Sequence, residues 1–342
     1  MNKKPKQNEI SQSYLKGSDL HKREKIVLKD ASDKLGFIPN KLLGRSSWWT
    51  SKEIGAFHYL GTYKGKSAIL KIQGVKPAVS EIYMINSFQK ANKSKIIRPP
   101  HLYAFIPWDD KKRYEALILE DTGNQTVINP LTKQIEIDEF FNLYEEYRNN
   151  CLKTAWIEKP DLTLSENIKA NFDAWKKTSF KLYPTHPLRK EYDENLIDAA
   201  INVLTLNYQG IEPQFMHGHF SATDLYRVNE QIVLLSNLYW SYRNPYRDAV
   251  FGYHWFMLSL SDIPYISAEK IDEQKKLWLD KIYSLPKNDI ENKLLNLALL
   301  ERAAAGLNLD ALSINPDLEV SKYLVETTRK EVKRLIKLPS HK

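Results

Sequence analysis

The residues best suited to proton transfer or metal binding gather in one polar stretch, HGHFSATDLY, at residues 217–226. His217 and His219 lie close together, and Asp224 follows them in the same stretch. A neutral imidazole can accept a proton from a hydroxyl group because its ordinary pKa, about 6.5, is close to physiological pH. Histidine and aspartate are also side chains that can bind a metal ion. These residue types could therefore transfer a proton or hold a metal.

A second interpretation of the two histidines is a zinc site, with His254 or Asp224 as a third ligand. Structural zinc sites usually include cysteine. The chain has one cysteine, Cys151, which lies far from both histidines in the sequence. We therefore do not expect zinc, and the same count excludes an intrachain disulfide.

The first part of the chain must form a small sheet. A KGK turn at 64–66 joins the segments AFHYLGTY and SAILKIQG and predicts a β-hairpin. We expect one strand before the hairpin, in SSWWTSKEIG (46–55), and two after it, in HLYAFIPW and YEALILED. The spacing of apolar residues predicts a helix after the hairpin at 78–92 and another ahead of the sheet at 21–35.

The remainder of the chain is predicted to be mainly helical. After Gly123, apolar residues recur with helical spacing, as in IDEFFNLYEEYRNNCLKTAW and NLIDAAINVLTLNYQ. Residues 214–240 interrupt this pattern with short extended segments and polar turns. We predict an α+β protein of two lobes, with an extension at 1–45, a β-rich lobe at 46–122 and a helical lobe at 123–342.

This order of elements resembles the protein-kinase-like fold in its aminoglycoside and choline phosphotransferase branch. Local motifs match that family in order and spacing over roughly residues 46–310. They are Lys71 in AILKI with Glu81 in the next helix, the hinge-like strand YEALILEDTG, the loop HGHFSATDLY, the strand LLSNLYW, and Asp248 in RNPYRDAVF.

The resemblance implies a site for ATP or another purine nucleotide between the two lobes. Lys71 would hold the phosphates, and Glu81 would fix Lys71 through an ion pair. The backbone around Glu120 and Asp121 would meet the adenine. A glycine-rich phosphate loop is not visible before the hairpin, where WWTSKEIG contains a single glycine.

The loop departs from the family's HGDxxxxN pattern at its chemical centre. His219 stands where the family has its catalytic aspartate, and Asp224 stands where it has a metal-binding asparagine. Asn237 replaces the family's second metal ligand, an aspartate. The resemblance assigns His217 and Asp248 to support of the loop. We therefore expect His219 to act as the base and Asp224 and Asn237 to bind Mg²⁺.

Charge and hydropathy restrict the partners. The net charge of the 342 residues is +8. Residues 1–50 contain eleven Lys or Arg and five Asp or Glu, and residues 322–342 contain seven Lys or Arg and two Asp or Glu. The two ends therefore carry +6 and +5, which leaves a net charge of −3 for the residues between them. We do not expect the folded part to bind nucleic acid. No apolar stretch approaches the roughly 20 residues of a membrane helix, and no signal peptide is apparent, so the sequence predicts a soluble, cytoplasmic protein.

Two functional classes follow from these patterns. The first is an atypical ATP- and Mg²⁺-dependent kinase that phosphorylates a hydroxyl group of a small molecule. An acidic groove in the second lobe would suit an amine-bearing acceptor, although the carboxylates of EIDEFFNLYEEY are more typical of a solvated helix face. The alternative is an inactive, pseudokinase-like protein that binds a nucleotide or a protein partner in the same place.

Overall fold

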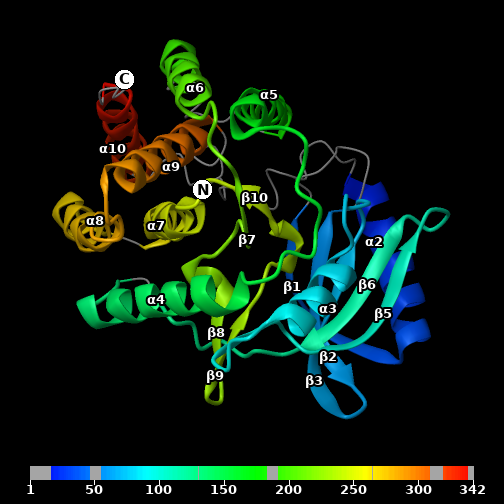
Figure 1. Cartoon of the computed structure of the whole chain (residues 1–342). Helices are drawn as coiled ribbons and strands as arrows, with labels where there is room; N and C mark the ends of the chain where they lie inside the picture. Colours follow the sequence, from blue (N-terminus) through cyan, green and yellow to red (C-terminus); the bar gives the residue numbers. More distant parts are fainter. Residues whose placement is uncertain are drawn as a thin grey trace.

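A five-stranded antiparallel sheet forms the smaller lobe (Figure 1). The computed structural model describes residues 17–46, 55–129, 131–182, 192–263, 265–308 and 319–337. In spatial order the strands are β1 (Phe37–Ser46), β2 (Ala56–Tyr63), β3 (Lys66–Gln73), β6 (Tyr114–Glu120) and β5 (Leu102–Asp109). Lys64 and Gly65 form the β2–β3 turn with φ angles of 49° and 78°, the left-handed pair that favours a two-residue hairpin. The predicted hairpin is confirmed.

The first strand of the sheet lies earlier in the chain than the sequence predicted. β1 begins at Phe37, within the segment assigned to the extension, and pairs with β2 along its whole length. Irregularities in its register between Pro39 and Lys41, and again between Leu42 and Gly44, mark β-bulges. A proline and a glycine in an edge strand break the alternating pattern that identifies strands in a sequence. Most of the expected strand at 46–55 lies outside the described residues.

Alternate residues of the sheet face two helices on opposite sides. On one face, α2 (Gly17–Leu35) packs with Leu70 and Ile72 of β3. On the other face, α3 (Glu81–Ala91) packs with Leu117 of β6. α3 follows β3 directly, so the predicted order of hairpin and helix is confirmed. The helix predicted ahead of the sheet is confirmed as α2, which covers the face opposite to α3 (Figure 1).

We expect the packing of α2 to stabilise the smaller lobe. Val27 is 6% exposed against the sheet, whereas its neighbour Ile26 is 61% exposed. Val27→Asp places a carboxylate among apolar side chains and should lower the free energy of unfolding by about 3 kcal/mol. Ile26→Asp is the matched control and should change it by less than about 0.5 kcal/mol. Chemical denaturation checks both values, and equal effects would show that α2 does not dock as described.

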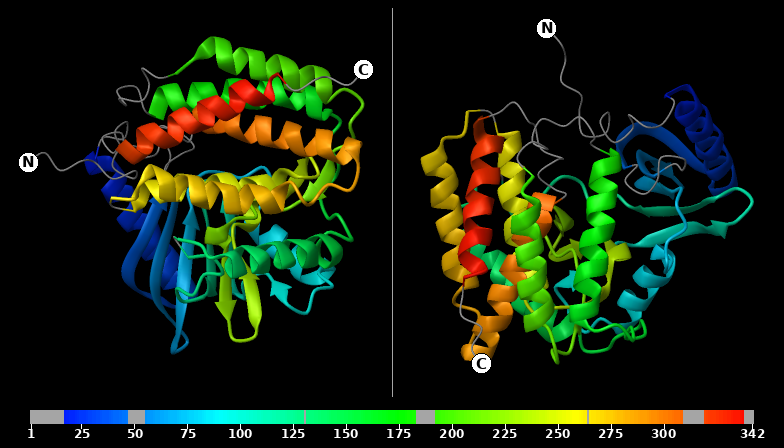
Figure 2. Two further views of the ribbon diagram at one scale, coloured as in Figure 1. Left: turned by 90° about the vertical axis from the view of Figure 1, so that its left-hand side faces the viewer. Right: turned by 90° about the horizontal axis from the view of Figure 1, so that it is seen from above.

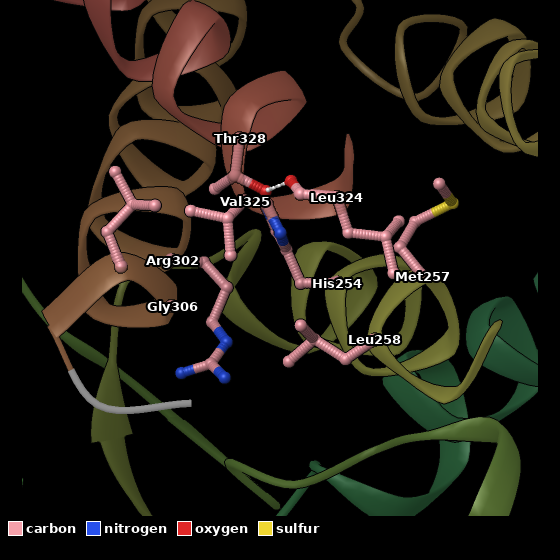
Figure 3. A pocket seen from close by; sticks show the side chains of 9 residues that line it. His254, Met257, Leu258, Arg302, Gly306, Leu324, Val325 and Thr328 are labelled. Atoms are coloured by element: carbon pink, nitrogen blue, oxygen red, sulfur yellow. Dashed lines mark hydrogen bonds between the residues drawn. The ribbon is translucent and has the colours of Figure 1, made fainter. Parts of the chain in front are cut away.

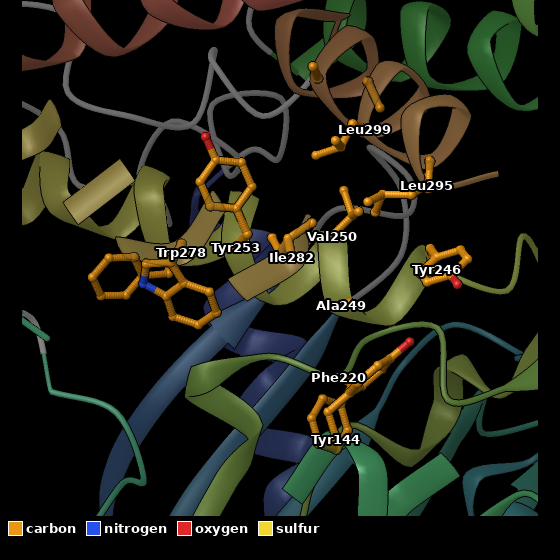
Figure 4. Packing of buried hydrophobic residues seen from close by; sticks show 14 of the residues in the cluster. Tyr144, Phe220, Tyr246, Ala249, Val250, Tyr253, Trp278, Ile282, Leu295 and Leu299 are labelled. Carbon is orange, nitrogen blue, oxygen red and sulfur yellow. The ribbon is translucent and has the colours of Figure 1, made fainter. Parts of the chain in front are cut away.

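The larger lobe is built around α7 (Arg247–Ser259), in which every residue from Arg247 to His254 is buried. α7 packs against α8 (Ala268–Ile282) and α9 (Asp289–Asn308), and α4 (Gln134–Glu146) packs against α8. α9 in turn packs against α5 (Leu164–Leu182), α6 (Glu194–Asn207) and α10 (Glu319–Leu335), and Figure 2 gives two further views of these helices. Val250 of α7 and Leu295 and Leu299 of α9 belong to one apolar core (Figure 4). This core positions the loop that precedes α7.

Short strands and turns carry the loop region that the sequence predicted at 214–240. The strands are β7 (Gln214–Met216), β8 (Leu225–Val228), β9 (Gln231–Leu234) and β10 (Ser241–Arg243), and β4 (Ile97–Arg98) pairs in parallel with β9. Two 3₁₀ turns, at Ala222–Asp224 and Asn237–Tyr239, place polar residues between them. The predicted interruption of the helical lobe is confirmed.

A clamp formed by Arg98, Glu120 and Gln231 joins the two lobes. Arg98 lies in β4 of the larger lobe, and its two terminal nitrogens donate to the two carboxylate oxygens of Glu120 at the end of β6. Its Nε donates to Gln231 Oε1 at 2.9 Å. The N–H of His101 donates to Glu120 Oε1 at 2.9 Å. Bidentate pairs of this kind are strong and directional, so the clamp fixes one edge of the sheet to the larger lobe.

The predicted two-lobed α+β architecture is therefore confirmed. In the described part of the chain, every helix is too short or too polar to cross a membrane.

Cys151 is buried, and burial raises the pKa of its thiol to about 12, so the thiol is protonated and inert.

Candidate functional site

An ion pair between Lys71 and Glu81 lies on the α3 side of the sheet. Lys71 alternates with the buried residues Leu70 and Ile72, so its side chain points to the opposite face from theirs. Glu81 is the first residue of α3, and the hydroxyl of Ser80 caps that helix. Lys71 Nζ and Glu81 Oε2 are 2.5 Å apart, with side-chain exposures of 13% and 3%. The structure brings these two predicted residues together.

Two titratable side chains that sequence reasoning missed lie near this ion pair. His58 is the β2 partner of Lys71, and burial, together with the Lys71 charge, lowers the pKa of His58 to about 3. Glu115 of β6 accepts a hydrogen bond from Ser80 Oγ at 2.9 Å, and burial raises its pKa. The two-residue turn sets the register between β2 and β3, so the sequence could have identified His58 as the partner of Lys71. No local sequence signal identifies Glu115.

Glu120 and Asp121 lie at the end of β6, where the resemblance placed the adenine. The carboxylate of Glu120 belongs to the clamp, and its N–H donates to the carbonyl of His101 at 3.0 Å. The carboxylate of Asp121 accepts from Ser67 Oγ at 2.6 Å and from the N–H of Gly123 at 3.0 Å. Both side chains and the Glu120 N–H are therefore engaged within the protein and hold the turn between the lobes.

Asp248 holds the backbone of the catalytic-like loop. Its carboxylate accepts from the Tyr147 hydroxyl at 2.7 Å and from the N–H of Phe220 at 3.5 Å, and it also accepts from the N–H of Gly218. The Tyr147 hydroxyl accepts in turn from the N–H of His217 at 2.5 Å. Tyr147 begins a π-helical turn after α4, an irregularity that often occurs at functional sites. These contacts agree with a supporting role for Asp248.

His217 lies in the interior behind the loop. Its ring is fully buried and meets Trp240 edge to face, with centroids 5.0 Å apart. Burial lowers the pKa of His217 to about 3, so this imidazole is neutral at physiological pH. Without access to solvent, it can support the loop but cannot exchange a proton with a ligand.

His219 and Asp224 form a hydrogen-bonded pair. His219 Nδ1 lies 2.7 Å from Asp224 Oδ2, Ser236 Oγ donates to Oδ1 at 2.5 Å, and Ser221 Oγ also donates to Oδ2. Burial alone would raise the pKa of Asp224, but His219 and the two hydroxyls together lower it, so the carboxylate is ionised. Ser236 adopts φ 59°, a left-handed conformation that is uncommon outside glycine and concentrates at functional sites. An ionised Asp224 keeps a proton on Nδ1 and leaves the His219 Nε2 lone pair available.

Three aromatic rings surround the imidazole of His219. Tyr239 stacks on it at 4.5 Å and 18°, and Phe251 and Trp255 lie 4.4 and 5.8 Å away between ring centroids. The His219 side chain remains 19% exposed. Gly218 permits this arrangement, because it has φ +78° and a Cβ there would lie 2.7 Å from the Tyr239 carbonyl oxygen. The ring is thus held in one orientation while its edge can reach a ligand.

The predicted magnesium ligands do not fit a metal site as they are placed. Asn237 is fully buried, its amide nitrogen donates to the Leu234 carbonyl at 2.9 Å, and its oxygen accepts from Trp240 Nε1 at 3.1 Å. Both oxygens of Asp224 are engaged by His219 and two serines. Mg²⁺ requires several hard oxygen ligands in near-octahedral geometry, and with the Asn237 oxygen turned to Trp240 the two side chains do not form such a set.

The residues of the zinc interpretation do not come together as a ligand set. Among the residues that the structure describes, no group of three or more His, Cys, Asp or Glu side chains could hold a metal ion. His217, His219, His254 and Asp224 all lie within those residues. The first histidine is buried behind the loop and the second is already bonded to Asp224, which explains why they do not form a ligand set.

The fold is that of the kinase-like phosphotransferases. Neither a protein-family model nor a curated protein matches the chain in sequence. An amicoumacin kinase with AMP-PNP, Ca²⁺ and Ami matches in structure with a TM-score of 0.56 and 14% identity, over 93% of this chain and 96% of that one. The aminoglycoside phosphotransferase APH(4)-Ia with ADP and hygromycin B matches with a TM-score of 0.54 and 10% identity, over 91% of this chain and 98% of that one. A choline kinase from Cryptosporidium parvum matches with a TM-score of 0.52 and 12% identity, over 87% of this chain and 88% of that one. The resemblance inferred from the motifs is confirmed for the fold.

Proposed function

We propose that the chain is an ATP-dependent phosphotransferase that phosphorylates a hydroxyl group of a small molecule. The buried Lys71–Glu81 ion pair carries this proposal. A lysine held by a carboxylate under a small sheet can neutralise the phosphates of a nucleotide, and phosphoryl transfer depends mainly on such positioning and charge neutralisation. Two neighbours of the same fold hold ADP or AMP-PNP, which supports a nucleotide in this chain.

His219 is the residue that we assign to proton transfer. Because Asp224 keeps the Nδ1 proton in place, Nε2 accepts the proton of the acceptor hydroxyl. As that proton moves, the hydroxyl oxygen bonds to the γ-phosphorus of ATP, and the bond from this phosphorus to the bridging oxygen of ADP breaks. The ionised Asp224 and the stacked ring of Tyr239 stabilise the imidazolium that forms. We assign no protein ligand to Mg²⁺.

ATP should stabilise the chain, and Lys71→Met should remove this effect. At a hundredfold excess over its Kd, a nucleotide that binds only the folded state adds about 2.7 kcal/mol to the free energy of unfolding. Methionine keeps the length of the side chain but lacks the charge that meets the phosphates. Thermal unfolding with millimolar ATP, with and without Mg²⁺ or Mn²⁺, measures the effect, and ADP formation with a panel of hydroxyl compounds measures turnover.

Lys76→Met is the matched control for this experiment. Lys76 forms an exposed pair with Asp110 at 2.9 Å in the same lobe, so its loss removes the same charge away from the site. We expect this variant to keep the full response to ATP. If ATP has no effect on the wild-type chain in any of these conditions, the proposal is wrong. ATP binding without turnover would instead establish the pseudokinase-like alternative.

A further inference from the structure

A buried carboxyl group on the sheet contacts the first turn of α3. Glu115 lies near the start of β6 and is 0% exposed. Its side chain shares a face of the sheet with that of Leu117, because alternate residues of a strand point the same way, and Leu117 packs against α3. Ser80, the cap of α3, donates from Oγ to Glu115 Oε2 at 2.9 Å, and the N–H of Glu81 also donates to this carboxyl group. β6 therefore holds the beginning of the helix through hydrogen bonds.

Both of these hydrogen bonds end on one oxygen of Glu115. Among the described residues Oε1 has no hydrogen-bond partner, so Oε2 accepts from both the Ser80 hydroxyl and the Glu81 N–H. The Ser80 hydroxyl in turn accepts from the N–H of Ile82 at 3.2 Å. The first four N–H groups of a helix have no partner within the helix, and Glu115 and Ser80 together satisfy two of them. Glu115 thus extends the helix cap across to the sheet.

The same turn carries the carboxylate that holds Lys71. Glu81 is the first residue of α3, and its Oε2 lies 2.5 Å from Lys71 Nζ. The other contacts of α3 on this face of the sheet join apolar side chains, among them Ile82 and Ile85. Apolar contacts have no preferred direction, whereas hydrogen bonds restrict both distance and angle. The hydrogen bonds to Glu115 therefore fix the rotation of the first turn and the position of Glu81.

The charges near Glu115 indicate that it acts as a hydrogen-bond acceptor. Burial raises the pKa of Glu115 and the charge of Glu81 raises it further, whereas the hydrogen bonds and the charge of Lys71 oppose this shift. Lys71 is already paired with Glu81, so a second negative charge beside the same ammonium group is not needed to balance it. An uncharged group with an oxygen in the same place should therefore serve as well.

We propose that Glu115 is a positioning residue, which keeps Glu81 in contact with Lys71 by holding the first turn of α3 against the sheet. This inference rests on the proposed phosphotransfer, in which Lys71 meets the phosphates. Glu115 itself is fully buried and does not reach a ligand. Without its two hydrogen bonds the turn opens more often, Glu81 leaves Lys71, and the lysine is no longer held where the phosphates bind.

Two substitutions of similar size at Glu115 test the inference without any nucleotide. Glutamine keeps an oxygen that can accept both hydrogen bonds, whereas methionine fills the same space and has no such oxygen. Acetic anhydride acetylates accessible lysines, and mass spectrometry gives the rate at Lys71 relative to the exposed Lys76. Lys71 should react about tenfold faster in Glu115→Met than in the wild-type chain, because the loss of a buried hydrogen bond shifts a local opening by about that factor. Glu115→Gln should keep most of the protection.

Two variants elsewhere separate positioning from a general loss of stability. Val325→Ala removes apolar volume beside a cavity in the larger lobe, which Figure 3 shows, and Ser267→Ala removes the equivalent cap from α8. Both should lower the denaturation midpoint and leave the reaction rate of Lys71 unchanged. Ser80→Ala should accelerate this reaction as Glu115→Met does, and it provides a second test if the methionine variant does not fold.

The inference is overturned if Lys71 is equally protected in Glu115→Met and the wild-type chain, if glutamine and methionine have the same effect, or if Val325→Ala exposes Lys71 as strongly. Isothermal titration with ATP uses the same preparations, and Glu115→Met should raise the Kd about tenfold. Protection of Lys71 that depends on Glu115, without any response of the wild-type chain to ATP, would refute the phosphotransfer and retain the positioning role. A response to ATP that Glu115→Met leaves unchanged would do the reverse.

Discussion

Replacing His219 by alanine should lower the rate of phosphoryl transfer by a factor of about 10² to 10⁴, the usual contribution of a positioned general base. The affinity for ATP should change little, because the phosphates are assigned to Lys71 on the other lobe. The rate of ADP formation and the ATP-induced shift in melting temperature measure the two quantities separately. A variant that loses turnover but keeps the shift distinguishes a base from a residue that only maintains the fold.

Asp224→Asn provides a further test of the same pair. An asparagine cannot hold the proton on Nδ1 of His219 as a carboxylate does, so the rate should fall without loss of ATP binding. His101→Ala is the control, since His101 is exposed just before β5 and its hydrogen bonds to Glu120 use only backbone atoms of His101. An unchanged rate in His219→Ala would exclude this histidine as the base.

Acid should destabilise the chain well before its carboxylates become protonated. His217 and His254 are buried, and burial lowers the pKa of both, to about 3 for His217. In the unfolded chain both have the ordinary value of 6.5. Between these limits only the unfolded state takes up the protons, so the stability present above pH 6.5 is lost as the pH falls toward the folded-state values. At pH 5 the loss should be about 2 kcal/mol for each histidine.

Chemical denaturation at pH 7 and pH 5 measures this loss. His254→Gln should remove about a third of the pH dependence, because glutamine does not titrate while His217 and His58, whose pKa values are both lowered to about 3, still contribute. His101→Gln makes the same substitution at an exposed position and serves as the control for the change of side chain. A free energy of unfolding that is equal at the two pH values would contradict the buried, neutral state of these side chains.

Local patterns predicted the parts of the fold that local interactions determine. A two-residue turn and alternating apolar residues identified the hairpin, and Lys71 followed from its place in that strand. β1 escaped prediction because Pro39 and Gly44 hide its alternation, while pairing with β2 supplies the missing stability. In such an edge strand, pairing with the neighbouring strand decides the structure more than the intrinsic β-propensity of its residues does.

The internal contacts of the candidate site were less predictable than the order of its residues along the chain. The motifs place His219 and Asp224 in one loop, but they do not reveal that the two side chains bond each other. Ser236 bonds the other oxygen of Asp224 and approaches from a turn after β9 in a left-handed conformation. Asn237 follows it and turns toward Trp240 in the interior. The orientation of polar side chains is decided by such three-dimensional contacts, which a motif does not encode.

The Arg98–Glu120 clamp is one of the places where the smaller lobe is held to the larger one. It lies at the end of β6, whereas the strand order places β1 at the far edge of the sheet. A second contact is made by α3, whose Phe88 lies 5.8 Å from Trp156 and 4.8 Å from Trp240 between ring centres. A rotation of the lobes that kept both contacts would move β1 and β2 most, so we expect substitutions at the β1–β2 edge to alter the rate of nucleotide exchange more than its equilibrium.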